Sequence, residues 1–315
     1  MPLDALRTPD ERFENLPGFP YAPHYLEDLP GYEGLRMAVI DEGPKDAPVF
    51  LCLHGEPSWS YLYRKMIPHF LDAGGRCVVP DLYGFGRSDK PTKQADYTFN
   101  FHRGSLLALV DRLDLQNITL VCQDWGGILG LTLPLEAPDR YKRLLIMNTA
   151  LPLEPEASIV AKDIFDRPEG EPPKTGFGAW LAFSQSRDQM ACGKLIARGC
   201  GAELSEAEIA AYDAPFPDAS YQAGALVFPR LVPWRSDMEG YDLGQRALAF
   251  WNKWDGQTFM AVGDADPVLG LPVMNRMQAE IKGCPPPMVI KGGGHFVQER
   301  GDEIAPAALK AFGHK

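Results

Sequence analysis

The stretch at residues 117–134 constrains the fold more than any other part of the chain, because it is typical of a strand, a sharp turn and a helix in immediate succession. It begins with an apolar, β-branched run at 118–121, breaks at the sequence Gln-Asp-Trp-Gly-Gly at 123–127, and continues as an apolar segment of helical length. A turn of this kind holds the side chain at its apex, here Asp124, out at the carboxyl end of a parallel sheet.

This pattern is typical of the nucleophile elbow of the α/β-hydrolase fold, in which serine is the usual nucleophile. A carboxylate is already an anion at neutral pH and can displace a leaving group from saturated carbon, so Asp124 predicts alkyl transfer to a carboxylate. Cys122 stands where the usual pattern has glycine, and we interpret it as a small residue that the turn tolerates. Taken alone, the pattern also fits Asp124 as the N-cap of the following helix.

The length of the chain, 315 residues, is typical of one α/β domain with an inserted subdomain. The formal net charge of −11 argues against nucleic acid or an anionic membrane as a partner. No secretion signal or long apolar run is found, so we expect the protein in the cytoplasm. The six cysteines show no Cys-x-x-Cys spacing, and we expect them to be buried and reduced, without a zinc site or disulfides.

Strands and helices alternate on both sides of the elbow, which predicts a doubly wound, mostly parallel eight-stranded sheet. Residues 1–34 are expected to form an arm with turns, and 35–41 a strand of an antiparallel edge pair. Further strands are expected at 49–53, 77–79, 144–148, 258–262 and 288–290, and helices at 59–71, 101–113, 243–254, after Pro272 and at 303–312.

The alternation stops after Thr149. The next 80 or so residues contain connectors rich in proline and acidic residues, an aromatic segment of helical character around Trp180, and the sequence Ser205-x-x-Glu208, which is typical of a capping box. We predict that residues 151–230 form a helical cap over the active-site end of the sheet. The core domain would then consist of residues 1–150 and 231–315.

An alkylated carboxylate is an ester, so turnover needs a base that activates water. Among the six histidines, His295 stands in the glycine loop directly after the last predicted strand, and this loop lets the imidazole reach back over the sheet. The acid that orients this base is expected between the nucleophile and the histidine, just after a strand. We choose Asp266, which lies deep in the loop before Pro267, and keep Asp264 as the alternative.

The turn at 54–57, His-Gly-Glu-Pro, follows another predicted strand. The backbone N–H of Glu56 is expected beside the elbow, where it and the N–H of Trp125 would stabilise the oxyanion of the breaking ester. His54 is expected to be structural. Glu56 also brings a second carboxyl group near Asp124, so we expect one of the pair to have a raised pKa and Glu56 to help hold the hydrolytic water.

Displacement at saturated carbon also needs groups that take up the leaving group. The indole N–H of Trp125 donates and cannot accept, which suits a halide ion in an apolar pocket. A second donor is expected from the cap, and we choose Trp180. A tryptophan at that position, taken in isolation, would be interpreted as an aromatic residue of the cap core.

Five stretches of the chain together resemble the haloalkane dehalogenases. They are His-Gly-Glu-Pro-Ser-Trp-Ser-Tyr-Leu-Tyr-Arg-Lys-Met at 54–66, Gln-Asp-Trp-Gly-Gly at 123–127, Ser-Tyr-Gln-Ala-Gly at 220–224, Gly-Gln-Thr-Phe-Met-Ala at 256–261 and Gly-His-Phe-Val-Gln-Glu at 294–299. They are most similar to the subgroup that has glutamate in the His-Gly-Glu-Pro loop and the acid after the later strand. The resemblance extends from about residue 50 to the carboxyl end and is weakest at 152–173.

The resemblance implies a hydrolase that cleaves the carbon–halogen bond of a short haloalkane through a covalent aspartyl-alkyl ester. It implies a small halogenated alkane and a halide ion as partners, and no cofactor or metal. The implied roles are nucleophile for Asp124, base for His295, acid for Asp266, oxyanion donors for Glu56 and Trp125, halide donors for Trp125 and Trp180, and pocket positions for Phe177, Ile128, Val268 and Leu269.

The closest alternative function is that of an epoxide hydrolase, which also uses an aspartate elbow and a His-Gly-x-Pro loop. Such an enzyme needs cap tyrosines that protonate the epoxide oxygen, and Tyr212 and Tyr221 are available. Glu56 and Trp180 favour the dehalogenase. A non-catalytic receptor with the same fold is a further alternative, against which the complete set of triad candidates argues.

Overall fold

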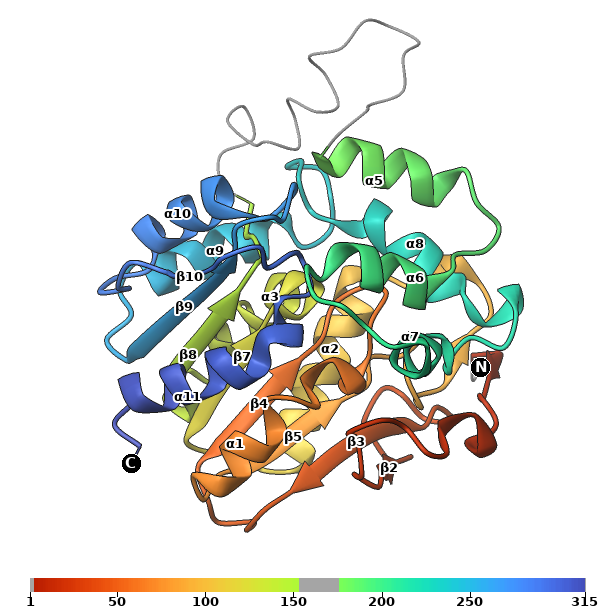
Figure 1. Cartoon of the computed structure of the whole chain (residues 1–315), viewed down its shortest axis with the longest axis horizontal. Helices are drawn as coiled ribbons and strands as arrows, with labels where there is room; N and C mark the ends of the chain where they lie inside the picture. Colours follow the sequence, from red (N-terminus) through yellow and green to blue (C-terminus); the bar gives the residue numbers. More distant parts are fainter. Residues whose placement is uncertain (1–2, 153–175, 315) are drawn as a thin grey trace, which may run out of the picture.

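The computed structural model of the protein describes residues 3–152 and 176–314, and its centre is an eight-stranded sheet (Figure 1). The strand order is β10-β9-β8-β7-β4-β5-β3-β2. In chain order the strands are β2 (His24–Leu26), β3 (Met37–Glu42), β4 (Val49–Leu53), β5 (Arg76–Pro80), β7 (Ile118–Cys122), β8 (Tyr141–Met147), β9 (Gln257–Gly263) and β10 (Met288–Ile290). All neighbours are parallel except β2, β3 and β5, which pair antiparallel in that order. The predicted eight-stranded, mostly parallel sheet is confirmed.

Helices cover both faces of this sheet. They are α1 (Ile67–Asp72), α2 (Phe99–Arg112), α3 (Asp124–Gly130), α9 (Tyr241–Trp251), α10 (Leu271–Glu280) and α11 (Gly301–Ala311). Helices α1 and α11 lie in front of the sheet in Figure 1, and α2 and α3 lie behind it. Because both faces are covered, the central strands β4 and β7 are buried at every residue, which accounts for their continuous apolar sequences.

The predicted helix at 59–71 is wrong as a single element. The chain forms a 3-10 helix at Ser60–Tyr63 and then the separate helix α1. Pro68 lies in the first turn of α1, where its missing N–H costs no hydrogen bond. In one continuous helix, Pro68 would lack an internal hydrogen bond and its ring would collide with the preceding turn.

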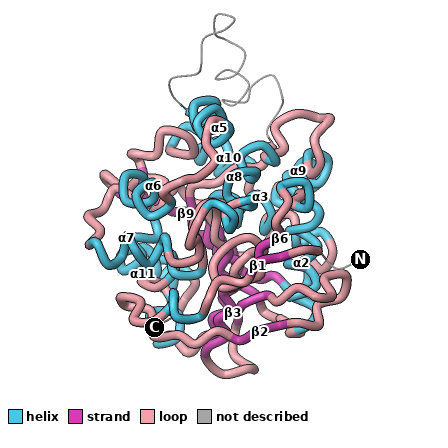
Figure 2. Tube along the Cα trace, turned by 90° about the vertical axis from the view of Figure 1, so that its right-hand side faces the viewer, coloured by secondary structure: helices cyan, strands magenta, loops and turns pink. Residues whose placement is uncertain are grey.

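The first 34 residues contain two short strands that the sequence did not reveal. Strand β2 pairs with β3 at the edge of the main sheet, and β1 (Ala5–Leu6) pairs with β6 (Lys90–Pro91) in a separate two-stranded sheet. Figure 2 shows this small sheet beside the main one. Strands of two or three residues are too short to produce a recognisable alternation of apolar and polar positions.

Among the described residues, four α-helices follow β8 and precede α9, in the part of the chain where a helical cap is predicted. They are α5 (Gly176–Gln185), α6 (Cys192–Gly199), α7 (Glu206–Asp213) and α8 (Ala223–Leu231). The predicted capping box is present at the start of α7, where Ser205 and Glu208 bond each other's backbone N–H. The acidic connector at 168–173 lies outside the described residues, and the domain boundaries at 150 and 230 stay a prediction.

All six cysteines lie within the described ranges, and each is buried with a free thiol, as expected. No helix within those ranges is long and apolar enough to span a membrane.

Candidate active site

Asp124 stands at a sharp turn between β7 and α3, as the elbow pattern predicts. Its φ angle is +49°, in the left-handed region that residues other than glycine rarely occupy. The turn leaves no room for side chains around it, since a Cβ atom on Gly126 would lie 2.0 Å from the carbonyl oxygen of Leu53. This backbone holds the Asp124 carboxylate at the carboxyl end of the sheet.

The alternative that Asp124 caps helix α3 is wrong. The N-cap residue is Gln123, and its side chain makes no capping hydrogen bond. The Asp124 carboxylate instead accepts the backbone N–H of Glu56 at 2.9 Å through Oδ1. A Cβ atom on the preceding Gly55 would lie 2.2 Å from Asp124 Oδ1, so this close approach requires glycine.

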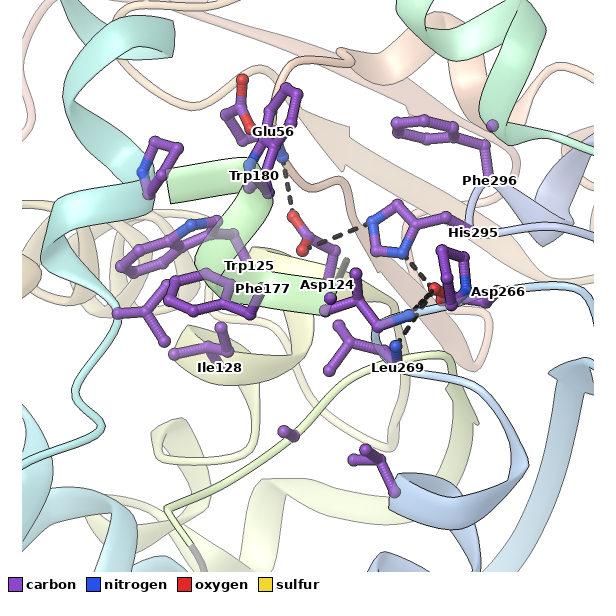
Figure 3. A pocket seen from close by; sticks show the side chains of 18 of the residues that line it. Glu56, Asp124, Trp125, Ile128, Phe177, Trp180, Asp266, Leu269, His295 and Phe296 are labelled. Carbon is purple, nitrogen blue, oxygen red and sulfur yellow. Dashed lines mark hydrogen bonds and ion pairs between the residues drawn. The ribbon is translucent and has the colours of Figure 1, made fainter. Parts of the chain in front are cut away.

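His295 lies between two carboxylates, as Figure 3 shows. Its Nδ1 is 2.8 Å from Asp266 Oδ2, and its Nε2 is 3.4 Å from Asp124 Oδ2. The Asp266 side chain is fully buried, and its Oδ1 accepts the backbone N–H groups of Val268 at 2.8 Å and Leu269 at 3.0 Å. The structure therefore brings together the three side chains that the sequence suggests as nucleophile, base and acid.

Asp264, the alternative acid, lies on the outer side of the same loop. It is exposed, and its Oδ1 accepts the backbone N–H of Gly292 at 2.7 Å. Asp264 thus holds the backbone of the glycine loop, whereas Asp266 contacts the imidazole ring that the loop carries.

The charges of the triad shift the pKa values of its members in opposite directions. Burial lowers the pKa of His295, but Asp266 and Asp124 outweigh burial and raise it to about 10. Burial raises the pKa of Asp266, but His295 and the two backbone N–H groups outweigh burial and lower it to about 2. As long as Asp124 is ionised, His295 is therefore an imidazolium at neutral pH.

Glu56 brings a second carboxyl group next to Asp124, and its pKa is raised well above the usual value. Burial is the main cause and the charge of Asp124 adds to it, while His295 and a hydrogen bond with the Trp180 side chain act in the opposite direction. Glu56 is 4% exposed, and its Oε1 has no hydrogen-bond partner among the described residues. Burial and the nearby charge of Asp124 therefore favour the neutral form of Glu56.

His54 is fully buried and joins two turns of the core, in agreement with a structural role. Its Nδ1 is 3.0 Å from the carbonyl oxygen of Gly55, and its Nε2 accepts the backbone N–H of Leu82 at 3.0 Å. Because a carbonyl oxygen only accepts, Nδ1 carries the proton and both ring nitrogens are satisfied.

The carboxylates open into a mostly apolar cavity of about 750 Å³ between the sheet and the cap helices. The residues named from the sequence as halide donors and pocket positions all line this cavity: Trp125, Trp180, Phe177, Ile128, Val268 and Leu269. The Trp125 ring packs 4.7 Å from that of Phe228, between their centroids. The mostly apolar lining of the cavity suits a substrate that has no hydrogen-bonding groups.

Neither cap tyrosine of the epoxide-hydrolase alternative lines the described wall of the cavity. Tyr212 is fully buried, donates its hydroxyl to Glu299 and accepts from Arg64 at 3.2 Å. The undescribed segment 153–175 contains no tyrosine in its sequence. The structure thus provides no tyrosine hydroxyl that could protonate an epoxide.

Residues 48–302 match the family model of the alpha/beta hydrolase fold. A haloalkane dehalogenase of Psychrobacter cryohalolentis is 45% identical to this chain over 316 residues, which cover 99% of both proteins. The chain belongs to the haloalkane dehalogenases. A haloalkane dehalogenase of Mycobacterium marinum is 40% identical over 308 residues, 96% of this chain and 98% of the relative. The solved tetrameric structure of haloalkane dehalogenase DpaA from Paraglaciecola agarilytica is similar with a TM-score of 0.90 and 50% identity, covering 99% of this chain and 100% of that one.

Two polar side chains of this haloalkane dehalogenase site escaped the sequence analysis. Asn148 donates through Nδ2 to Asp266 Oδ2 at 2.9 Å and accepts the N–H of Gly263 at 2.8 Å, so it orients the acid. Gln123 lies against His295. Both residues stand at the carboxyl end of a parallel strand, next to an apolar run, and that placement was the signal that could have identified them.

Helix α6 also contacts the loop of His295 directly. The carbonyl oxygen of Gly199 accepts the backbone N–H of His295 at 2.6 Å, and that of Cys200 accepts the N–H of Gly294 at 3.0 Å. These two carbonyl groups lie at the carboxyl end of α6, about 95 residues before the loop in the sequence. No local pattern predicts a contact over that separation.

Proposed function

We propose that this haloalkane dehalogenase hydrolyses the carbon–halogen bond of a short haloalkane in two steps. The Asp124 carboxylate attacks the halogen-bearing carbon, forms an alkyl ester and expels a halide ion. Water then attacks the ester carbonyl, the acyl–oxygen bond breaks, and the alcohol and a proton leave while Asp124 is regenerated. The observation that supports this proposal best is the placement of a carboxylate at the strained elbow, in an apolar cavity and beside an imidazole that is held by a second carboxylate.

The first step needs no base, because Asp124 attacks as an anion. Its Oδ1 accepts the N–H of Glu56, which leaves Oδ2 to bond to carbon. The apolar wall strips water from the carboxylate when a haloalkane enters, and a less hydrated anion is a stronger nucleophile.

The halide is taken up by Trp125 and Trp180 in this proposal. Trp180 hydrogen bonds with Glu56 in the structure, so it must exchange this partner for the halide. The raised pKa favours the neutral form of Glu56, and a neutral carbonyl oxygen is a weaker acceptor than a halide ion in an apolar cavity. The exchange is therefore favourable once the leaving group carries a negative charge.

The second step becomes possible because the first step removes the negative charge of Asp124. Esterification neutralises Asp124, which is one of the two groups that raise the pKa of His295. The pKa of the imidazole then falls, which favours its neutral form, and its Nε2 can take a proton from water while Asp266 stabilises the cation that forms. Glu56 Oε1, which has no partner among the described residues, accepts a hydrogen bond from this water in the proposal. The backbone N–H groups of Glu56 and Trp125 stabilise the oxyanion.

We also propose that residues 1–150 and 231–315 form the catalytic core and that residues 151–230 form the cap that closes the cavity. Cap residues Phe177 and Trp180 line the same cavity as the elbow residues Trp125 and Ile128. The cap thus sets the size of the haloalkane that fits.

The proposal is tested by halide release from 1,2-dibromoethane and 1-bromobutane, run beside hydrolysis of styrene oxide. We expect halide from the wild type and none from Asp124→Ala. Turnover in oxygen-18 water should label the Asp124 carboxylate, since water attacks its carbonyl carbon. Diol from the epoxide without halide would instead make the protein an epoxide hydrolase, and absence of the label would refute the ester.

A further inference from the structure

The side chain of Gln123 is fully buried beneath the base and is not used in the mechanism above. Its Nε2 lies 3.0 Å from His295 Nε2 and also donates to the backbone carbonyl oxygen of His295 at 3.0 Å. On its other side, Gln123 Oε1 accepts from Gln298 Nε2 at 3.3 Å. One amide group therefore contacts the backbone and the reactive nitrogen of the same histidine.

These partners determine which way the amide points. The carbonyl oxygen of His295 can only accept, so it requires the amide nitrogen of Gln123, and the donor on Gln298 requires the amide oxygen. The amide consequently presents N–H groups, and no acceptor, to His295 Nε2.

We propose that Gln123 is a positioning residue that holds the imidazole of His295 with Nε2 as a hydrogen-bond acceptor, ready for the water that hydrolyses the alkyl ester. This inference rests on the proposed two-step function. The N–H bonded to the His295 carbonyl oxygen stays in place throughout, and the contact with Nε2 is exchanged for the O–H of the incoming water.

Gln123 can act in this way because its N–H groups disfavour the protonated imidazole of His295, whereas the carboxylates around the ring favour it. Asp124 on α3 and Asp266 after β9 favour the imidazolium, and Glu56 after β4 is the third titratable group near the ring. An imidazolium would place its Nε2–H against an amide N–H, so two donors would face each other. Once Asp124 is an ester, only Asp266 favours the cation among these groups, and Gln123 shifts the balance towards the neutral base.

The inference predicts a selective defect, because His295 acts only in the second step. In Gln123→Leu we expect the first halide release to stay within about twofold of the wild type and ester hydrolysis to slow by about tenfold or more, as expected for the loss of one hydrogen bond. The acidic limb of the pH profile for ester hydrolysis should move to higher pH in Gln123→Leu. It should move further in Gln123→Glu, whose carboxylate favours the imidazolium.

The experiment is rapid-mixing measurement of bromide release and of the alkyl-enzyme by mass spectrometry, from pH 5 to 10. Gln222→Leu is the matched control, because Gln222 is a buried glutamine that bridges backbone groups of Met190 in the cap. We expect no selective change in this control. Equal slowing of both steps in Gln123→Leu, or an unchanged acidic limb, would overturn the inference.

Two further outcomes separate the possible failures. If Gln123→Leu does not fold, Gln298→Met removes the donor that orients the amide, together with a hydrogen bond to Tyr63, and leaves Gln123 itself in place. That variant should move the acidic limb in the same direction by a smaller amount, and an unmoved limb would overturn the inference. If the wild type itself releases no bromide or forms no alkyl-enzyme, the proposed function fails before Gln123 is tested.

Discussion

The elbow that carries Asp124 and the loop that carries His295 are held in different ways. Asp124 is positioned by the backbone of the core, between β7 and α3, where Gly126 packs against Leu53. His295 sits in a loop that is fixed by groups distant in the sequence, among them the carbonyl oxygen of Gly199 in the cap. In the proposed mechanism the two reaction steps therefore depend on different parts of the molecule, and substitutions in the loop should affect hydrolysis without affecting alkylation.

The largest separation of the two steps should come from removing the base. We expect His295→Phe to release one halide per enzyme molecule in a normal first turnover and then to stop, with steady-state turnover reduced by a factor of about 1,000 or more. Mass spectrometry should find the alkyl group on Asp124. A variant that fails already in the first turnover would show that the elbow depends on His295, contrary to the comparison.

The contact between the cap and the loop should give the next largest effect. Gly201 has a φ angle of +66°, and a Cβ atom there would lie 2.1 Å from the carbonyl oxygen of Gly292. Gly201→Ala should push the loop away from the elbow and slow ester hydrolysis by about tenfold or more, with a loss of stability of about 1–3 kcal/mol.

Gly283→Ala provides the matched control for this substitution. Gly283 also has a left-handed backbone, at a φ angle of +71°, but has open space around its Cα. We expect a similar conformational penalty and normal hydrolysis. If both variants hydrolyse the ester equally fast, the cap contact does not position the base.

Glu56→Gln tests the turn at 54–57, where Glu56 lies near both Asp124 and His295, and we expect a smaller, pH-dependent effect. Burial and Asp124 raise the pKa of Glu56 and favour its protonated form, so the amide should change hydrolysis at pH 7 by less than about tenfold. The change in rate that accompanies ionisation of Glu56 as the pH rises should vanish in the variant. Identical pH profiles would show that Glu56 does not hold the water.

The raised pKa of Glu56 also makes the stability of the folded protein depend on pH. A carboxyl group whose pKa is higher in the folded state contributes stability below its unfolded pKa of about 4.5, and this contribution is lost as the pH rises towards the folded value. Urea unfolding between pH 5 and 9 should therefore show a steeper loss of stability in the wild type than in Glu56→Gln.

The smallest effect is expected for Tyr212→Phe, which removes a hydroxyl that joins the cap to the buried Glu299. The Glu299 carboxylate keeps Arg64 at 2.6 Å, so we expect a loss of about 1 kcal/mol in stability and normal halide release. In the control Tyr83→Phe, the removed hydroxyl is buried and has no partner among the described residues, so stability should not fall. Loss of turnover in Tyr212→Phe would contradict this prediction and indicate a catalytic role for the tyrosine.

The sequence predicted the core elements well because their signals are local. The apolar runs at 49–53 and 118–121 became buried strands, and the turn at 123–127 became the elbow. One expected element was wrong for a local reason, because Pro68 divides the expected helix at 59–71. That correction could have been made from the sequence by giving the proline its full weight.

The sequence alone determined which side chains are available for the chemistry: an aspartate at an elbow, a histidine after the last strand, and two aspartates in one loop. Only the tertiary structure decided between Asp266 and Asp264, assigned the raised pKa to Glu56, and placed Gln123 and the carbonyl groups of α6 against His295. The physical reason is that a motif is a property of neighbouring residues, whereas burial, charge and hydrogen bonding depend on groups that meet only when distant segments pack together.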